Sequence, residues 1–355
     1  MNFRDSVQHS AFFDCYLQKT NDMAYKIAFF GAKPYDIASF DKVNEKFGYD
    51  IRYYKGHLNL NNIVLTQGVD VVCIFVNDTA DAAVIDAMVK NGVKLLALRC
   101  AGFNNVDLKA AKGKLPIVRV PAYSPYAVAE YALALMLSLN RKIHRAYWRT
   151  RDGNFSLNGL MGFDMHGKTI GIIGTGKIAK ILIRILKGFG MTVLGYDLYP
   201  DEKFAAEEGM TYVTLDELYS RSDIISLHCP LTDQTKYIIN KDSIAKMKDG
   251  VMIINTGRGM LIHTNDLIDG LKEKKVASAG LDVYEEEGEY FYEDQSDKII
   301  DDDVLARLLS FNNVIVTSHQ AFFTKEALHN IAETTLQNIQ DFSQHKPLVN
   351  EVVCK

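Results

Sequence analysis

The sequence predicts an α/β protein with parallel sheets, divided into about two domains. Short apolar runs alternate with helical patterns almost throughout the chain, which is typical of parallel sheets. The length of 355 residues suits two domains, since one domain takes roughly 100–200 residues. A long helical segment, residues 125–151, and a glycine-rich passage after it interrupt the alternation. We therefore expect one series of strands before this interruption and a second after it.

The first series contains five predicted strands. Helical patterns lie between them at Tyr35–Gly48 and Asp81–Asn91, and each ends in glycine or asparagine, which commonly stop helices. The strands are predicted at Lys26–Phe30, Ile51–Tyr54, Val69–Phe75, Lys94–Leu98 and Ile117–Arg119.

The second series follows one predicted helix at Pro125–Arg151 and the glycine-rich stretch NGLMGFDMHG. The acidic stretch Glu285–Asp303 has poor periodicity and is expected to be a long loop, a kind of segment that is often functional. Six strands are predicted, at Thr169–Ile173, Thr192–Tyr196, Ile224–Leu227, Val251–Asn255, Ala277–Asp282 and Val314–Thr317.

The composition argues against several classes of protein. Forty basic and forty-four acidic residues leave a net charge of −4, so neither a nucleic-acid partner nor an anionic membrane is expected. The longest apolar stretch, Tyr131–Leu137, is far shorter than the roughly 18 residues of a spanning helix. Five cysteines without a C-x-x-C pair indicate neither a disulfide framework nor a metal site. We expect a cytoplasmic, metal-free protein.

The first residues do not resemble a targeting segment. An acidic residue, Asp14, interrupts their apolar patch, whereas a secretory signal needs an uninterrupted apolar region of roughly 7–15 residues. Mitochondrial leaders are rich in arginine, and this stretch contains one. Residues 1–23 are expected to form a flexible appendage before the fold.

A glycine fingerprint follows the first strand of the second series. Gly174 permits a tight turn, Gly176 lets the backbone approach a pyrophosphate, and the small Ala179 permits close packing of helix on strand. The pyrophosphate would lie at the positive end of the helix dipole. A structural glycine turn is the alternative, but the strand before and the helical pattern after favour a dinucleotide-binding Rossmann unit.

An acidic residue at the end of the next strand indicates which dinucleotide binds. Asp197 lies 23 residues after Gly174, close to the offset of about 20 expected for the acid that binds the ribose. A carboxylate there accepts hydrogen bonds from ribose hydroxyls and repels a 2′-phosphate. The sequence therefore favours NAD over NADP.

Residue types common in catalysis follow three later strands. Arg258, between two glycines, suits bidentate binding of a carboxylate, although an isolated loop arginine is more often solvated. His319 follows the last predicted strand, and Asp282 ends the strand between these two. Open α/β sheets bind ligands at such carboxyl ends. Periodicity does not choose among three nearby glutamates: Glu285, Glu286 and Glu287.

These motifs together resemble the D-2-hydroxyacid dehydrogenases, and most closely their bacterial fermentative D-lactate dehydrogenase branch. The resemblance covers about residues 26–346, and Ala179 departs from the glycine usual in this family's fingerprint. It implies catalytic roles for Arg258, Glu287 and His319. The motifs are IAFFGAKPYD, RCAGFNNVDL, VPAYSPYAVAEYALALMLSLNRK, GKTIGIIGTGKI, DIISLHCPLTDQTKYIIN, MKDGVMIINTGRG, GLDVYEEE and TSHQAFFT.

The same resemblance implies the domain plan and further contacts. A substrate domain of residues 24–122 and 320–355 would surround an inserted NAD-binding domain of residues 123–319. The helix at 125–151 resembles the family's dimerisation helix, so a homodimer or homotetramer is expected. Cofactor contacts are implied at Gly174, Gly176, Lys177, Ile178, Asp197, Cys229, Pro230, Thr235, Thr256 and Asp282. Substrate contacts are implied at Val76, Asn77, Tyr123 and Arg258.

The expected reaction is reversible hydride transfer between NADH and pyruvate, giving D-lactate. Arg258 would hold the substrate carboxylate, and His319 would give a proton to the carbonyl oxygen. Glu287 would favour the imidazolium form of His319. Asp282 would orient the nicotinamide side or Arg258.

Four other functions share parts of this pattern. The first alternative is the same reaction on a bulkier 2-oxo acid. The size of the pocket near Tyr123, Phe322 and Phe75 would decide between the two substrates. Phosphoglycerate dehydrogenase is disfavoured because such enzymes usually carry a regulatory extension. Formate dehydrogenase is disfavoured because formate oxidation needs no proton donor such as a His319–Glu287 pair. An NADH-sensing corepressor, a binding module of the same fold, would need an extended interaction tail.

Overall fold

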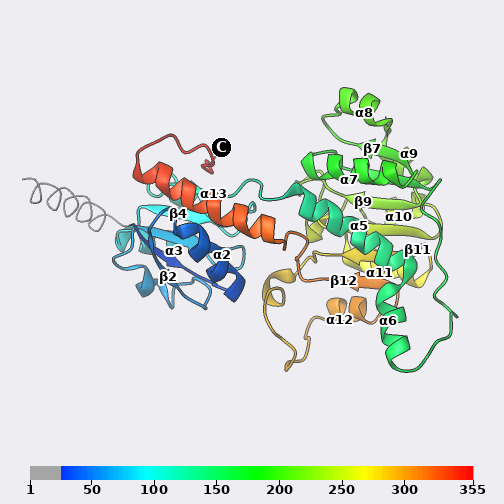
Figure 1. Cartoon of the computed structure of the whole chain (residues 1–355), viewed down its shortest axis with the longest axis horizontal. Coiled ribbons are helices and arrows are strands. Elements are labelled where there is room, and N and C mark those ends of the chain that lie inside the picture. Colours follow the sequence, from blue (N-terminus) through cyan, green and yellow to red (C-terminus); the bar gives the residue numbers. More distant parts are fainter. Residues whose placement is uncertain (1–24, 355) are drawn as a thin grey trace, which may run out of the picture. The chain divides into compact units, whose positions relative to one another are not determined.

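The computed structural model describes residues 25–354, and these form two compact units (Figure 1). Among the described residues, the first unit contains residues 25–123 and 324–354, and the second contains Ser124–Phe323. Each unit holds one wholly parallel sheet, which confirms the predicted α/β class. The expected appendage, residues 1–23, lies outside the described residues.

The unit boundaries differ by a few residues from those expected. Tyr123 belongs to the first unit, and residues 320–323 belong to the second. The physical reason for the latter is that Gln320 and Ala321 donate their backbone N–H groups to the carboxylate of Asp282.

The first unit has a five-stranded sheet in the order β2-β1-β3-β4-β5. Every residue of β3 and β4 is buried, as expected for parallel strands that helices cover on both faces. The strands are β1 (Lys26–Phe29), β2 (Asp50–Tyr53), β3 (Val71–Ile74), β4 (Leu95–Leu98) and β5 (Ile117–Val118). The helices are α2 (Pro34–Asn44), α3 (Ala82–Lys90), α4 (Leu108–Ala111) and α13 (Lys325–Ser343).

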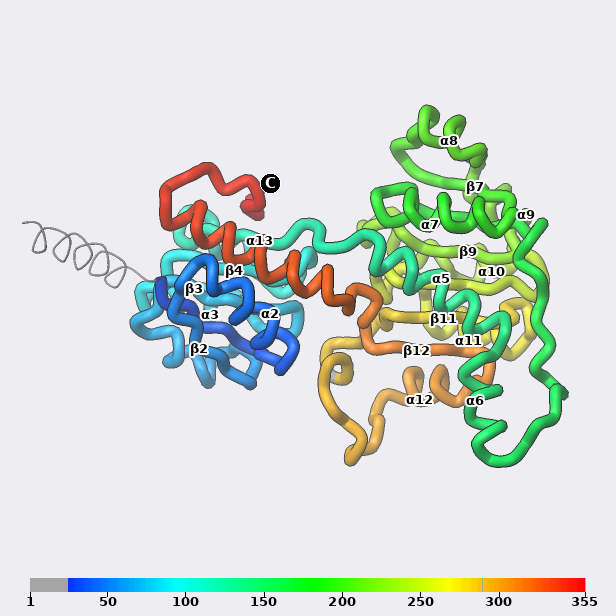
Figure 2. The backbone as a smooth tube through the Cα atoms, in the orientation of Figure 1, coloured from blue at the N-terminus to red at the C-terminus, as the bar shows by residue number. Residues whose placement is uncertain are grey.

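The C-terminal part of the chain completes this first unit. Helix α13 packs against α2 and β4, and the tube in Figure 2 shows it running beside α2. The strand order reverses between β1 and β3, because β2 lies on one side of β1 while β4 and β5 continue on the other side. Crevices at such reversal points, beyond the carboxyl ends of the strands, are where open α/β sheets bind ligands.

The second unit has a seven-stranded sheet in the order β12-β11-β10-β9-β6-β7-β8, which reverses between β6 and β9. Four strands have the predicted bounds: β6 (Thr169–Ile173), β7 (Thr192–Tyr196), β9 (Ile224–Leu227) and β10 (Val251–Asn255). The others are β8 (Thr211–Tyr212), β11 (Val276–Leu281) and β12 (Val314–Val316).

Helices cover both faces of this sheet and enclose a hydrophobic core on each. Figure 1 shows α5 and α7 side by side on one face, and they pack against each other. The helices are α5 (Pro125–Arg141), α6 (Ile143–Arg151), α7 (Lys177–Gly188), α8 (Glu202–Glu208), α9 (Leu215–Arg221), α10 (Lys241–Lys246), α11 (Thr264–Lys272) and α12 (Asp303–Leu309).

The prediction of one continuous helix at Pro125–Arg151 is wrong. The helix breaks at Lys142, which adopts a left-handed conformation with φ +51°. The Asn140 side chain donates to the carbonyl of Phe163 and accepts from its N–H, both at 2.8 Å. Lys142 donates to the carbonyl of Met161. The glycine-rich passage therefore folds back on the end of α5 and terminates it.

Residues 25–354 contain neither a membrane-spanning helix nor a metal-binding cluster. Within them, no helix combines the length and hydropathy required to span a membrane. The same residues contain no group of three histidine, cysteine or acidic side chains arranged to hold a metal ion.

Candidate active site

The centre of the candidate site is a hydrogen-bonding contact between His319 and Glu287. His319 Nδ1 lies 2.9 Å from Glu287 Oε1, and the two side chains are 19% and 25% exposed. His319 follows β12 and has φ +52°, an uncommon conformation for a residue other than glycine. Its N–H donates to the carbonyl of Asp282 at 2.7 Å. Such backbone outliers cluster at functional sites, where the surrounding contacts hold them in place.

The structure distinguishes the three glutamates that periodicity could not. Glu285 accepts the N–H of Thr264 at 2.7 Å and the hydroxyl of Tyr237 at 2.8 Å, so it is bound to the start of α11. Glu286 is exposed. Glu287 accepts the N–H of Tyr284 at 3.2 Å and uses its other oxygen for His319. Only Glu287 among the three pairs with the histidine.

Asp282 holds the loop that carries His319. Its buried carboxylate accepts the Thr317 hydroxyl at 2.6 Å and the backbone N–H groups of Gln320 and Ala321 at 2.9 and 2.8 Å. Burial raises the pKa of Asp282, and these hydrogen bonds together with the nearby charge of His319 oppose that rise. The contacts described for this carboxylate run to residues 317–321, and none runs to Arg258.

A tyrosine of the acidic loop also contacts His319. The Tyr292 hydroxyl donates to the carbonyl of His319 at 3.1 Å, and the two rings lie 6.0 Å apart between centroids. The sequence indicated only a long loop here. Residues 290–292 are all aromatic, and nothing in this stretch of the sequence indicates which of them contacts the histidine.

Arg258 lies at the carboxyl end of β10, next to β11, which Asp282 follows. Its carbonyl accepts the side-chain amide of Asn255 at 2.9 Å, and its guanidinium donates to the carbonyl of Gly257 at 2.7 Å. A Cβ on Gly259 would overlap the carbonyl of Tyr284, so only glycine fits after the arginine. Because β10, β11 and β12 are neighbours, Arg258, Asp282 and His319 follow adjacent strands at one edge of the sheet.

The glycine fingerprint lies at the point where this sheet reverses. Gly174 has φ +88°, and a Cβ there would overlap the backbone of Cys229, which follows β9. At Gly176 a Cβ would have no neighbour within 4 Å. Within the described residues, the N–H groups of Lys177 and Ile178 at the start of α7 donate to no acceptor. Such free donors at a helix N-terminus suit an anion.

Asp197 is positioned beside this loop by its own contacts. Its carboxylate accepts the N–H of Thr175 at 2.7 Å, the Thr175 hydroxyl at 3.1 Å and the N–H of Tyr199 at 2.9 Å. A carboxylate offers about four acceptor positions. Asp197 therefore keeps acceptor capacity for a further hydroxyl group.

The remaining predicted cofactor contacts follow β9 and β10. Burial raises the pKa of the Cys229 thiol to about 11. Thr235 donates its hydroxyl to the carbonyl of Pro230 at 2.6 Å, which shapes the loop after β9. The hydroxyl of Thr256 is buried and has no hydrogen-bond partner within the described residues. A buried orphan hydroxyl suits a polar group of a ligand, since leaving it unpaired costs free energy.

Three predicted substrate contacts lie in the first unit. Val76 and Asn77 form part of the turn after β3. Tyr123 ends the first segment of this unit, and its carbonyl accepts the side-chain amide of Asn330 from α13 at 2.6 Å. The turn is thus at the carboxyl end of a strand that borders the reversal point of its own sheet.

Comparison with known proteins identifies the family. The family model "D-isomer specific 2-hydroxyacid dehydrogenase, NAD binding domain" matches residues 133–321, more than half of the chain. The chain belongs to the D-isomer specific 2-hydroxyacid dehydrogenases. The matched residues lie within the second unit, and the enzyme is accordingly an oxidoreductase with an NAD-binding domain.

Individual relatives of this dehydrogenase cover nearly its whole length. D-lactate dehydrogenase of Escherichia coli K12 is 51% identical over 329 residues, which are 92% of this chain and 100% of that protein. A 2-hydroxyacid dehydrogenase homolog of Haemophilus influenzae is also 51% identical, over 92% of this chain and 99% of its own. The pyruvate reductase of Chlamydomonas reinhardtii superposes with a TM-score of 0.88 at 45% identity, over 92% of this chain and 98% of that one.

Proposed function

We propose that this dehydrogenase reduces pyruvate to D-lactate with NADH and catalyses the reverse reaction with NAD. The observation that carries the proposal is the Glu287–His319 pair, 2.9 Å apart at the strand ends of an NAD-binding domain. The choice of pyruvate is supported by the 51% identity to the E. coli D-lactate dehydrogenase and the 45% identity to the Chlamydomonas pyruvate reductase.

The residues present fit a nicotinamide dinucleotide. The unpaired N–H groups of Lys177 and Ile178 would bind the pyrophosphate, and Asp197 would accept from the adenosine ribose. The orphan hydroxyl of Thr256 would pair with the nicotinamide end. Contacts at Cys229, Pro230, Thr235 and Asp282 complete the proposed cofactor site. When bound, NADH supplies the hydride that the substrate carbon accepts.

The chain itself positions the substrate and moves the proton. Arg258 would bind the 2-oxo acid carboxylate with two parallel hydrogen bonds, which fixes the carbonyl for reaction. Because His319 Nδ1 faces Glu287, its Nε2 is the nitrogen left to give a proton to the carbonyl oxygen. Glu287 holds the ring through Nδ1, and Asp282 holds the histidine loop in place.

The turn after β3 would supply the other contacts to the substrate. The N–H of Val76 donates to no acceptor within the described residues, so it is available to an anionic ligand. We propose that Val76 and Asn77 contact the substrate carboxylate and that Tyr123 lines the same site. The aromatic ring of Phe75, at the start of the same turn, would limit the room for the substrate side chain.

A panel of 2-oxo acids tests the proposed substrate. NADH oxidation is measured with pyruvate, 2-oxobutyrate, 2-oxoisocaproate and phenylpyruvate at equal enzyme concentration. We expect the highest kcat/KM with pyruvate and a fall as the side chain grows. A higher value with 2-oxoisocaproate or phenylpyruvate would contradict the proposal and favour a bulkier 2-oxo acid as the substrate. A D-2-hydroxyisocaproate dehydrogenase of the same fold is 32% identical to this chain, with a TM-score of 0.82.

The proposed preference for NADH over NADPH depends on Asp197. A 2′-phosphate would bring a second negative charge next to this carboxylate, which is already held by Thr175 and Tyr199. Turnover with NADH should be much more efficient than with NADPH, and Asp197→Ala should narrow the ratio of the two kcat/KM values. Equal efficiency with both cofactors in the unmodified enzyme would contradict the proposal.

We also propose that the enzyme is a homodimer or homotetramer. Apolar side chains on α6 and the segment after it are exposed, an arrangement typical of protein interfaces. Light scattering in solution should give at least twice the 39.9 kDa mass of one chain, and a monomer would refute this. The exposed side chains are Ile143, Tyr147, Trp148, Phe155, Leu157 and Met161.

A further inference from the structure

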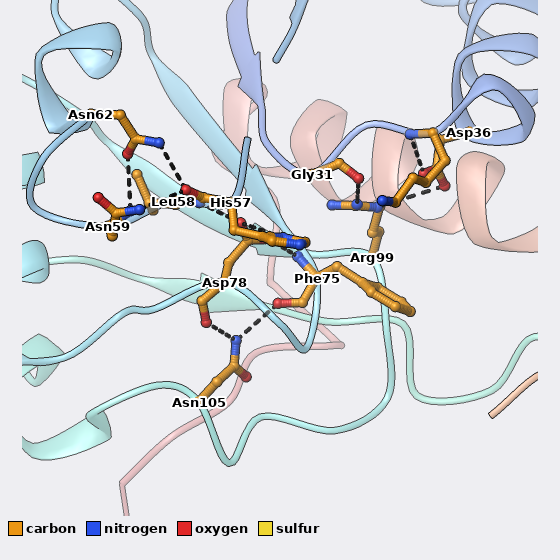
Figure 3. A network of polar contacts seen from close by, with 11 residues as sticks. Gly31, Asp36, His57, Leu58, Asn59, Asn62, Phe75, Asp78, Arg99 and Asn105 are labelled. Carbon is orange, nitrogen blue, oxygen red and sulfur yellow. Dashed lines mark hydrogen bonds and ion pairs between the residues drawn. The ribbon is translucent and has the colours of Figure 1, made fainter. Parts of the chain in front are cut away.

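A buried carboxylate holds the turn that follows β3. Asp78 is 2% exposed, and each of its oxygens accepts one backbone N–H at 2.6 Å. Oδ2 accepts from Phe75, which begins the turn, and Oδ1 accepts from Leu58 in the segment after β2. The carboxylate thus closes the turn on itself and ties it to a second segment of the same unit (Figure 3).

An amide holds the same turn through its carbonyl groups. The side-chain nitrogen of Asn105 donates to the carbonyl of Phe75 at 2.9 Å and to that of Asp78 at 2.8 Å. Figure 3 shows Asn105 reaching both carbonyls at once. The N–H of Asp78 also donates to the carbonyl of Phe75, at 3.2 Å. The carboxylate of Asp78 therefore accepts the first N–H group of the turn, and the amide of Asn105 donates to the carbonyl groups of its first and last residues.

A histidine and a buried arginine also lie near the turn. His57 Nδ1 lies 3.7 Å from Asp78 Oδ1. Arg99, 3% exposed, pairs with Asp36 at 3.7 Å and donates to the carbonyl of Gly31 at 3.1 Å. Its guanidinium lies 5.0 Å from the ring centroid of Phe75, so the side chain of the turn's first residue is also restrained. Together with the hydrogen bonds of Asp78 and Asn105, these contacts restrain the shape of the turn.

The turn lies where a ligand is expected on general grounds. It leaves β3 at the carboxyl end, and Gly31 leaves β1 beside it, at the reversal point of the five-stranded sheet. Phe75, Asp78 and Leu58 all have partners for their N–H groups, whereas the N–H of Val76 has none within the described residues. A rigid turn with one unused donor is preorganised for an acceptor on a ligand.

We propose that Asp78 is a positioning residue: with Asn105 it fixes the Phe75–Asp78 turn so that the Val76 N–H meets the substrate carboxylate. This inference rests on the proposed function, in which the turn contacts the 2-oxo acid. Asp78 itself touches no reacting atom. It acts through the backbone that it holds, and its loss should therefore weaken binding of substrate more than it slows the chemical step.

The test compares Asp78→Asn with a matched control. The amide of Asp78→Asn keeps the size but places an NH₂ group against a backbone N–H, so one of the two bonds is lost. The control, Asp70→Asn, alters another carboxylate that accepts a backbone N–H in this sheet, from Lys26 at 3.0 Å. Asp70 precedes β3 and thus lies at the opposite end of that strand from the turn.

The expected results separate positioning from stability. In Asp78→Asn the KM for pyruvate should rise about ten- to hundredfold, while kcat falls much less and the dissociation constant of NADH is unchanged. Asp70→Asn should lower the melting temperature but leave the pyruvate KM as in the unmodified enzyme. An unchanged pyruvate KM in Asp78→Asn, measured in an unmodified enzyme that does reduce pyruvate, overturns the inference alone. No pyruvate reduction by the unmodified enzyme would instead refute the proposed function.

A second variant keeps the test decisive if Asp78→Asn does not fold. Asn105→Asp replaces the donor to the two turn carbonyls by an acceptor, and leaves Asp78 intact. It should raise the pyruvate KM in the same way, again with unchanged NADH binding. A folded Asn105→Asp enzyme with the KM of the unmodified enzyme overturns the inference.

Discussion

Lysine in place of Arg258 should lower kcat/KM for pyruvate by about 10²- to 10³-fold, the range seen when one donor to a reacting group is lost. Lysine keeps the positive charge but lacks the planar fork that binds a carboxylate through two parallel hydrogen bonds. Within residues 25–354, the guanidinium of Arg258 donates to the Gly257 carbonyl, and its own carbonyl accepts the N–H of Leu261 and the side-chain amide of Asn255. This carbonyl still accepts both bonds after substitution, so folding should change little.

The measurements for Arg258→Lys are steady-state kinetics, NADH binding and thermal unfolding. Arg307→Lys is the control, because Arg307 belongs to the same unit and its guanidinium stacks on the ring of Phe311 at 4.7 Å. The control should keep normal turnover. If Arg258→Lys melts much earlier yet keeps near-normal turnover per folded molecule, the arginine is structural and the assignment of the substrate carboxylate is wrong.

Glutamine in place of His319 should reduce activity by about 10²- to 10⁴-fold at every pH, the usual contribution of a general acid. Glutamine cannot provide the proton, so no change of pH restores the reaction. The backbone bonds of residue 319 to Asp282 and Tyr292 do not involve the ring and should persist. His329→Gln, on α13 of the other unit, is the control and should keep full activity. Residual activity of His319→Gln that recovers at low pH would contradict the assignment of the proton donor.

Local patterns of residues predicted the sheets well. The strands β6, β7, β9 and β10 have the predicted bounds, because each is a short run of mostly apolar residues between turn or polar residues. The edges β8 and β12 are short or half-buried, so their pattern is weaker. The fingerprint was also readable, since Gly174 and Gly176 serve a local turn.

Contacts between distant segments were not readable from the sequence. The break at Lys142 depends on Asn140 binding the backbone of Phe163, 23 residues later. Glu287, and not Glu285, contacts His319 because the carboxylate of Glu285 already accepts hydrogen bonds from Thr264 and Tyr237. Periodicity reports which face of an element is buried, but not which partner a polar side chain meets.

The turn held by Asp78 and Asn105 shows the same limit. The two residues are 27 positions apart, and neither stands in a pattern that predicts a hydrogen bond. The family resemblance indicated the turn as a substrate contact, through Val76 and Asn77. The side chains that hold its backbone meet only in the folded chain, where the segment containing Asn105 lies against the turn after β3.

The central claim is that His319 gives and takes the proton and that Glu287 holds its ring through the other nitrogen. The value of kcat/KM, measured for pyruvate reduction and for D-lactate oxidation, tests it most directly. The same histidine is the acid in reduction and the base in oxidation, so a change in the carboxylate that holds it should affect both directions. Two carboxylates face this histidine, Glu287 at 2.9 Å and the buried Asp282.

Removing the charge of Glu287 should lower activity in both directions. Glu287→Gln replaces the charged acceptor of His319 Nδ1 by a neutral amide, so the ring is held less firmly and kcat/KM should fall about tenfold for reduction and for oxidation. Glu285→Gln, which alters the neighbouring carboxylate bound to Thr264 and Tyr237, should leave both values unchanged. Unchanged values in Glu287→Gln, or an equal fall in Glu285→Gln, would contradict the account.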